Sequence, residues 1–195
     1  MVKQLHLMLD GPGIAIFDPH LLADFLAQQG IATANLFQLF QRDTTIGDAV
    51  IQQGLVLPIY TIPPLDYQII LNDSGSSIVR TDWVRLTTTP FPLVVGCHNK
   101  LVVADIYSLM EWDAAFYQQM PLNETLAPQV AATVAAGNYA VTIKGFAERA
   151  YAGRGPTNIG YELLLNSVAS LPSIMAEQDV ESFDFVLWQP GQAKA

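Results

Sequence analysis

The chain has 195 residues, of which 51% are hydrophobic and 14% are charged, so it can bury a substantial core and does not have the composition of a disordered chain. Its 18 acidic and 9 basic side chains give a net charge of −9, which disfavours nucleic acid and anionic membranes as partners because both bind clustered Lys and Arg. The single cysteine, Cys97, excludes an intrachain disulfide and predicts a cytoplasmic protein.

The first predicted elements are two strands and a helix. The first ten residues hold one Lys and a very short apolar run, which does not fit a signal peptide. Residues 5–9 and 13–17 are predicted strands around a turn rich in Gly and Pro. A helix over residues 19–29 follows, with Asp18 as its N-cap and Pro19 at its first position. No apolar run in the chain reaches the roughly 18 residues that a bilayer requires.

The remainder of the first half mixes helix and strand patterns. Residues 31–40 fit either a strand or a short helix, and residues 44–53 fit a short helix. Pro58 places the strand predicted over residues 55–62 at a sheet edge. Two segments rich in β-branched and aromatic residues, 66–71 and 77–86, flank a turn-forming stretch and predict a hairpin.

The second half begins with predicted strands at residues 91–95 and 101–104, followed by a helix over residues 106–119. Residues 137–146 and 159–166 are predicted to pair as strands across a long loop. A short helix or turn at residues 172–179 and a last strand at residues 183–188 complete the prediction.

One pattern occurs twice along the chain. Asp105 lies 87 positions after Asp18, and at this offset an apolar pair, a Leu, an acid and an aromatic residue also coincide. Each copy reads as a strand that runs into an Asp-capped helix. We therefore predict an α+β fold, mainly antiparallel and sandwich-like, built from two internal repeats with one Asp-capped helix each. The expected domain is a single globular unit, 1–195, with repeat halves at about 1–88 and 89–195.

Few residues suggest catalysis. Asp18 and Asp105 could form an acid and base pair if the repeats bring them together, although helix capping already explains both. Cys97 and His98 are neighbours in a predicted turn, where adjacent side chains are poorly placed to share a proton. No nucleotide-binding loop, nucleophile elbow or dinucleotide fingerprint is present, and three scattered histidines do not predict a zinc site. We expect no catalytic residues, no metal and no cofactor.

Two charged regions are candidate binding sites. The densest acidic stretch, near the C-terminus, could contact a basic partner, and its members are Glu177, Asp179, Glu181 and Asp184. Arg149 and Arg154 lie among glycines in the long loop and could bind an anion. The alternatives are a solvated acidic segment and a solvated loop.

Three stretches resemble known families: residues 10–22 (DGPGIAIFDPHLL), 99–105 (NKLVVAD) and 136–141 (AGNYAV). They are similar to immunity proteins of bacterial polymorphic toxin systems and to competence-associated inhibitors of DNA-entry nucleases. This resemblance implies a non-enzymatic protein that binds and neutralises a toxin or nuclease.

The first functional hypothesis is thus an acidic, immunity-like inhibitor that binds a basic protein. The second is a small-molecule-binding or enzymatic domain with a site between the two repeats. A structural subunit that forms a homo-oligomer through exposed aromatic residues is the third.

Overall fold

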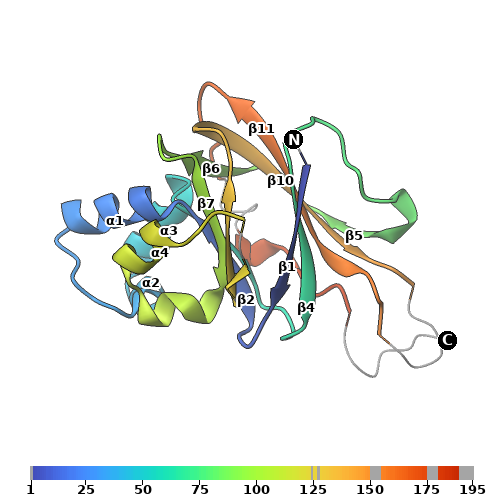
Figure 1. Cartoon of the computed structure of the whole chain (residues 1–195), viewed down its shortest axis with the longest axis horizontal. Coiled ribbons are helices and arrows are strands. Elements are labelled where there is room, and N and C mark those ends of the chain that lie inside the picture. The colour runs from blue at the N-terminus through green and yellow to red at the C-terminus, as the bar shows by residue number, and fades with distance from the viewer. Residues whose placement is uncertain (1, 124, 127, 150–154, 175–179, 189–195) are drawn as a thin grey trace.

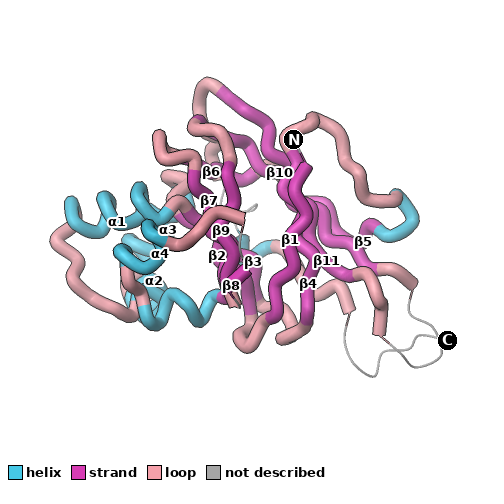
Figure 2. Tube along the Cα trace, viewed as in Figure 1, coloured by secondary structure: helices cyan, strands magenta, loops and turns pink. Residues whose placement is uncertain are grey.

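In the computed structural model, residues 2–123, 125–126, 128–149, 155–174 and 180–188 are described (Figure 1). The described chain forms three layers, with helices on one side, a sheet in the middle and a second sheet on the other side (Figure 2). None of its described helices is long and apolar enough to cross a membrane.

The strands of the first half are β1 (Val2–Met8), β2 (Gly13–Phe17), β3 (Val56–Tyr60), β4 (Asp66–Asn72) and β5 (Val84–Thr87). The strands of the second half are β6 (Phe91–Val95), β7 (Lys100–Asp105), β8 (Thr125–Leu126), β9 (Gln129–Thr133), β10 (Gly137–Ala147) and β11 (Ile159–Val168). The α-helices are α1 (Pro19–Gln28), α2 (Leu36–Arg42), α3 (Thr44–Gln52) and α4 (Ala114–Gln119). The 3₁₀ segments are η1 (Thr81–Trp83), η2 (Ile106–Glu111) and η4 (Val180–Ser182).

Both sheets contain strands from both halves of the chain. The outer sheet has the order β1-β4-β11-β10-β5, and β6 also pairs with β10. The middle sheet has the order β3-β2-β7-β9-β8. All the pairings in them are antiparallel except that of β11 with β4. The predicted α+β class with mainly antiparallel sheet is confirmed, and β3 lies at a sheet edge, as Pro58 indicated.

The middle sheet is covered on both faces, so β2 and β7 are buried along their whole length. Ile14 and Ile16 of β2 point toward the outer sheet and join the core between the two sheets. Ala15 and Phe17 point the other way and pack with the helices. The period-two alternation of a strand therefore supplies both cores from one segment.

The two halves use matching pairings. β1 pairs with β4 as β6 pairs with β10, and β2 pairs with β3 as β7 pairs with β9. Tyr67 and Tyr139, on β4 and β10, each donate a hydrogen bond to the carbonyl oxygen four residues earlier. Internal duplication of the sequence stays a prediction.

The hairpin predicted over residues 66–86 does not form. β4 pairs with β1 and β11, and β5 pairs with β10 instead. The buried carboxylate of Glu162 on β11 holds the segment after β4, because it accepts hydrogen bonds from the Asn72 side chain, the Ser77 hydroxyl and the Ile78 N–H. These bonds fold the segment over the sheet, so its apolar residues do not extend β4 into a hairpin.

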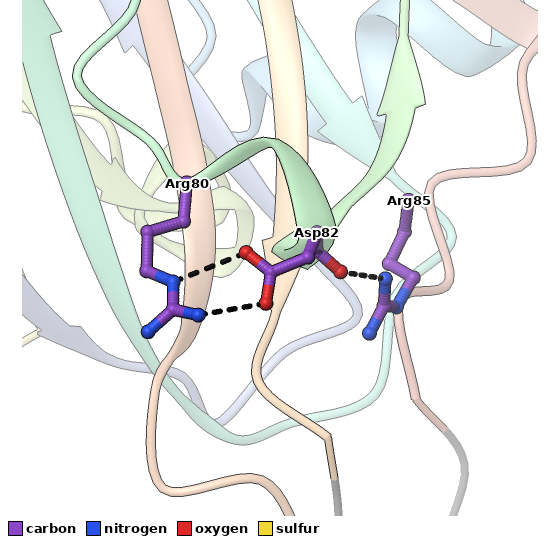
Figure 3. A network of polar contacts seen from close by, with 3 residues as sticks. All are labelled: Arg80, Asp82 and Arg85. Carbon is purple, nitrogen blue, oxygen red and sulfur yellow. Dashed lines mark hydrogen bonds and ion pairs between the residues drawn. The ribbon is translucent and has the colours of Figure 1, made fainter.

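The end of this segment carries a small polar network (Figure 3). Arg80 donates two hydrogen bonds to the Asp82 carboxylate, at 3.1 and 2.8 Å, and its guanidinium lies 5.0 Å from the centre of the Trp83 ring. Arg85 Nη1 donates to the backbone oxygen of Asp82 at 2.9 Å. All three groups of the network are exposed, so it shapes a surface turn.

Two further predictions are wrong. The helix expected over residues 106–119 is divided into η2 and α4, because Asp113 caps a new helix through the N–H groups of Ala115 and Phe116. Residues 183–188 form no strand. Phe185 is nevertheless buried in the core between the sheets, where its carbonyl oxygen accepts a hydrogen bond from Tyr161 Oη at 2.6 Å.

Candidate functional site

A pocket lies between the helical layer and the middle sheet, beside α2 and α3. Asp43 joins these two helices, and its Oδ1 accepts a hydrogen bond from the Ile46 N–H at 3.3 Å at the start of α3. Gly47 packs against the carbonyl oxygen of Phe40, where a Cβ would come within 2.7 Å. The helices therefore approach each other closely, and a cavity of about 460 Å³ remains between them, β2, β3 and η2.

The floor of this pocket is apolar. Ala15 and Val56 contribute to it from the middle sheet, and Ile106 and Leu109 contribute from η2. All four side chains are buried. Because Ala15 is short, the sheet does not fill the space below the helices. An apolar occupant would be stabilised by about 25 cal/mol for each Å² that it buries here.

The mouth of the pocket is acidic. Its charged residues are Asp48 on α3 and Glu181 on η4, and both are exposed. Tyr60 Oη donates a hydrogen bond to Glu181 Oε1 at 3.1 Å and so connects the end of β3 to η4. Among the described residues that line the pocket, none is basic. The lining therefore favours a positively charged occupant over an anion.

One member of the predicted acidic partner-binding segment, Glu181, lines this pocket. Glu181 and Asp184 are exposed, while Glu177 and Asp179 lie outside the described residues. Asp184 Oδ1 accepts a hydrogen bond from the Val186 N–H at 3.0 Å, and the residue lies at the surface. The sequence identified Glu181 but missed Asp48 and Tyr60, since no local pattern links α3 and β3 to residue 181.

The predicted anion-binding loop is described only in part. Arg149 is exposed, and Arg154 lies outside the described residues. At the base of the loop, Glu148 accepts hydrogen bonds from Thr157 and Asn158 at 2.6 and 2.7 Å. These bonds hold the pKa of Glu148 below its usual value. Anion binding by the two arginines stays a prediction.

Asp18 and Asp105 do not form an acid and base pair. In the antiparallel pair of β2 and β7, Asp105 lies opposite Ile14, whereas Asp18 follows the other end of β2. Four residues of strand separate the two positions, about 13 Å along the sheet. Each carboxylate instead accepts three backbone N–H groups: those of His20, Leu21 and Gly96 for Asp18, and those of Asp10, Gly11 and Tyr107 for Asp105.

Cys97 and His98 lie in a turn, and Cys97 is an exposed free thiol. The structure adds a contact that the sequence did not indicate, since the rings of His98 and His20 stack with their centres 3.7 Å apart. Burial and the neighbouring His98 lower the pKa of His20, and Asp18 opposes this effect. Within the described ranges, no cluster of three or more His, Cys, Asp and Glu side chains could hold a metal ion.

The fold and the pocket thus define an α+β protein with two layered, mainly antiparallel sheets and an acid-rimmed apolar pocket under a helical layer. Comparison with protein-family models and with curated proteins found no match.

Similar solved structures include ComJ from Bacillus subtilis, an inhibitor of the DNA-degrading activity of NucA. It is 13% identical, with a TM-score of 0.44, and the match covers 86% of this chain and 99% of ComJ. A second is the protein described as crocagin biosynthetic gene J, at 15% identity and a TM-score of 0.46, covering 84% of this chain and 96% of that one. A nuclease inhibitor is therefore among the similar structures, as the sequence resemblance indicated.

Proposed function

We propose that this protein is a non-enzymatic binding module that captures a basic protein, such as a toxin or nuclease, and neutralises it. The observation that carries the proposal is that Glu181, one member of the predicted acidic segment, lines the mouth of an apolar pocket. Protein interfaces combine an apolar centre with a polar rim, and a pocket can receive an anchoring side chain. Glu181, which lines the pocket and belongs to the acidic segment, joins these two parts.

Charge supports a basic partner. The chain has twice as many acidic as basic side chains, and carboxylates exposed at a rim accelerate association with a positively charged surface. Such rim charges also make the association dependent on salt. Binding should therefore weaken as the salt concentration rises.

The test uses the tagged full chain to capture proteins from a lysate of its source organism at low salt. We expect a stoichiometric basic protein that is released at high salt and whose toxic or nuclease activity falls when the chain is added. A charge-neutralised variant should lose this capture; it carries Glu177→Gln, Asp179→Asn, Glu181→Gln and Asp184→Asn. A control variant has the same charge change on other exposed acids, through Asp10→Asn, Asp24→Asn, Asp66→Asn and Glu111→Gln. This control should still capture the basic protein.

Capture that is equally strong in the charge-neutralised variant would remove the acidic segment from the interface. A captured protein whose activity is unchanged by the chain would contradict neutralisation.

The pocket itself also favours the second hypothesis, a small-molecule site between the two halves of the chain. Its lining combines residues 12–61 of the first half with η2 of the second half.

A further inference from the structure

The pocket has properties of its own beyond its position beside the acidic segment. Its volume of about 460 Å³ falls within the roughly 300–1,000 Å³ range of small-molecule sites. Its deep part is formed by buried aliphatic side chains, and the polar groups gather at the mouth. This distribution suits a ligand with an apolar body and one polar end.

The polar end of that ligand is specified by the groups at the mouth. Asp48 and Glu181 carry the charge, and both are carboxylates. An anionic ligand would meet repulsion from two sides, whereas an ammonium group would be attracted to both. The hydrogen bond from Tyr60 Oη holds one Glu181 oxygen in place, so this carboxylate is positioned before a ligand arrives.

The walls of the pocket add aromatic surface. Phe37 and Phe40 of α2 and Tyr60 of β3 are half-buried and line the cavity. Tyr107 packs edge-on against the Phe37 ring, with the ring centres 6.3 Å apart, and limits its movement. Aromatic faces attract organic cations through the ring quadrupole and also cover apolar groups.

We propose that this pocket binds a small organic cation, an amine whose protonated nitrogen lies between Asp48 and Glu181 and whose apolar body lies over Ala15 and Val56. The size of the cavity, the apolar floor, the aromatic walls and the acidic mouth all select the same chemical class. This proposal does not depend on the capture of a basic protein. A small amine in solution can enter the pocket of a single chain without a protein partner.

The experiment compares two probes with the same carbon skeleton and opposite charge, phenylbutylamine and phenylbutyrate. Each is titrated at low salt into the ¹⁵N-labelled full chain, and amide shifts are followed by NMR. We expect the amine to shift amides of α2, α3 and β3 in a saturable manner, and phenylbutyrate to bind at least tenfold more weakly. Equal binding of the two probes, or shifts confined to other elements, would overturn the proposal.

Variants locate the site. Asp48→Asn combined with Glu181→Gln should weaken amine binding at least tenfold, and Asp24→Asn, an exposed acid on α1, should leave it unchanged. Thr44 lines the pocket and is exposed, so Thr44→Trp introduces a bulky ring at the pocket lining and should block binding. Amine binding that survives both changes in folded protein would show that the ligand lies elsewhere. Capture of a basic protein by a chain that binds no amine would leave the proposed function intact and overturn this inference alone.

Discussion

The Asp105 carboxylate, at the end of β7, accepts a hydrogen bond of 2.7 Å from the backbone N–H of Gly11, which lies 94 positions earlier. Asp18, directly after β2, makes the reciprocal contact. Its carboxylate accepts a hydrogen bond of 2.8 Å from the backbone N–H of Gly96. Each Asp thus caps the segment that follows its own strand and also fixes the turn that precedes the other strand. This exchange ties the two halves together at both ends of the β2–β7 pair.

Removing the Asp105 carboxylate should therefore cost more than removing an ordinary helix cap. In Asp105→Ala, three backbone N–H groups lose their acceptor in a buried site, and we expect a loss of about 3 kcal/mol in the free energy of unfolding. Asp113→Ala removes an exposed cap of α4 and should cost about 1 kcal/mol. Urea unfolding of both variants measures the difference, and equal losses would show that the contact with residues 10 and 11 adds nothing.

Glu162→Gln tests the anchor of the segment after β4. The wild-type carboxylate accepts hydrogen bonds from Asn72, Ser77 and Ile78. In Glu162→Gln, an NH2 group replaces one of the two oxygens, and this group cannot accept a hydrogen bond from the donor that it faces. We expect a loss of about 2 kcal/mol in the free energy of unfolding. The Ile78 amide should also exchange with solvent much faster. If Ile78 exchange stayed at the wild-type rate, the carboxylate would not be what holds the segment.

The stacked histidines predict a pH dependence. The groups acting on His20 are His98, Asp18, Lys100 and Asp24, and burial is the largest cause of its lowered pKa. Because the unfolded chain then binds the proton more readily, the stability contributed by neutral His20 is present above the ordinary pKa of 6.5. It is lost as the pH falls below that value toward the lower pKa of the folded state.

The corresponding variant is His20→Phe, which keeps an aromatic ring beside His98 but cannot be protonated. Its urea midpoint should fall less than that of the wild type between pH 7 and pH 5.5. Parallel declines in the two proteins would assign the pH dependence to other groups.

The network of Figure 3 should contribute little to stability. Arg80 and Asp82 form an ion pair of 2.8 Å whose side chains are 64% and 63% exposed, and water screens such pairs strongly. We expect Asp82→Asn to leave the urea midpoint unchanged at 0.15 M salt. A clear fall in the midpoint would show that the turn from residue 80 to residue 85 supports the sheet.

Local chemistry allowed much of the fold to be predicted from the sequence. Asp18 and Pro19 mark the start of α1, period-two apolar residues mark β2 and β7, and the long pairing of β10 with β11 follows from its two strand patterns. The Asp18 cap belongs to the start of α1 itself, and β10 and β11 are consecutive strands, so local patterns were sufficient to predict α1 and this pair.

Tertiary structure decided the rest. β11 lies between β4 and β10, and the partner of β5 is β10, so the hairpin expected over residues 66–86 is replaced by contacts of β4 with β11 and of β5 with β10, two strands of the second half of the chain. Residues 183–188 have the composition of a strand, but they form none, and Phe185 is instead buried in the core between the sheets.

The same division holds for the candidate site. The sequence by itself determined an acidic α+β protein, with Asp18 and Asp105 as caps and Glu181 in an acidic segment. Only the tertiary structure placed Glu181 beside Tyr60 and on the same pocket as Asp48, because these residues come from three elements that no sequence periodicity relates. A pocket is a property of surfaces that meet in space, and local sequence patterns describe each surface alone.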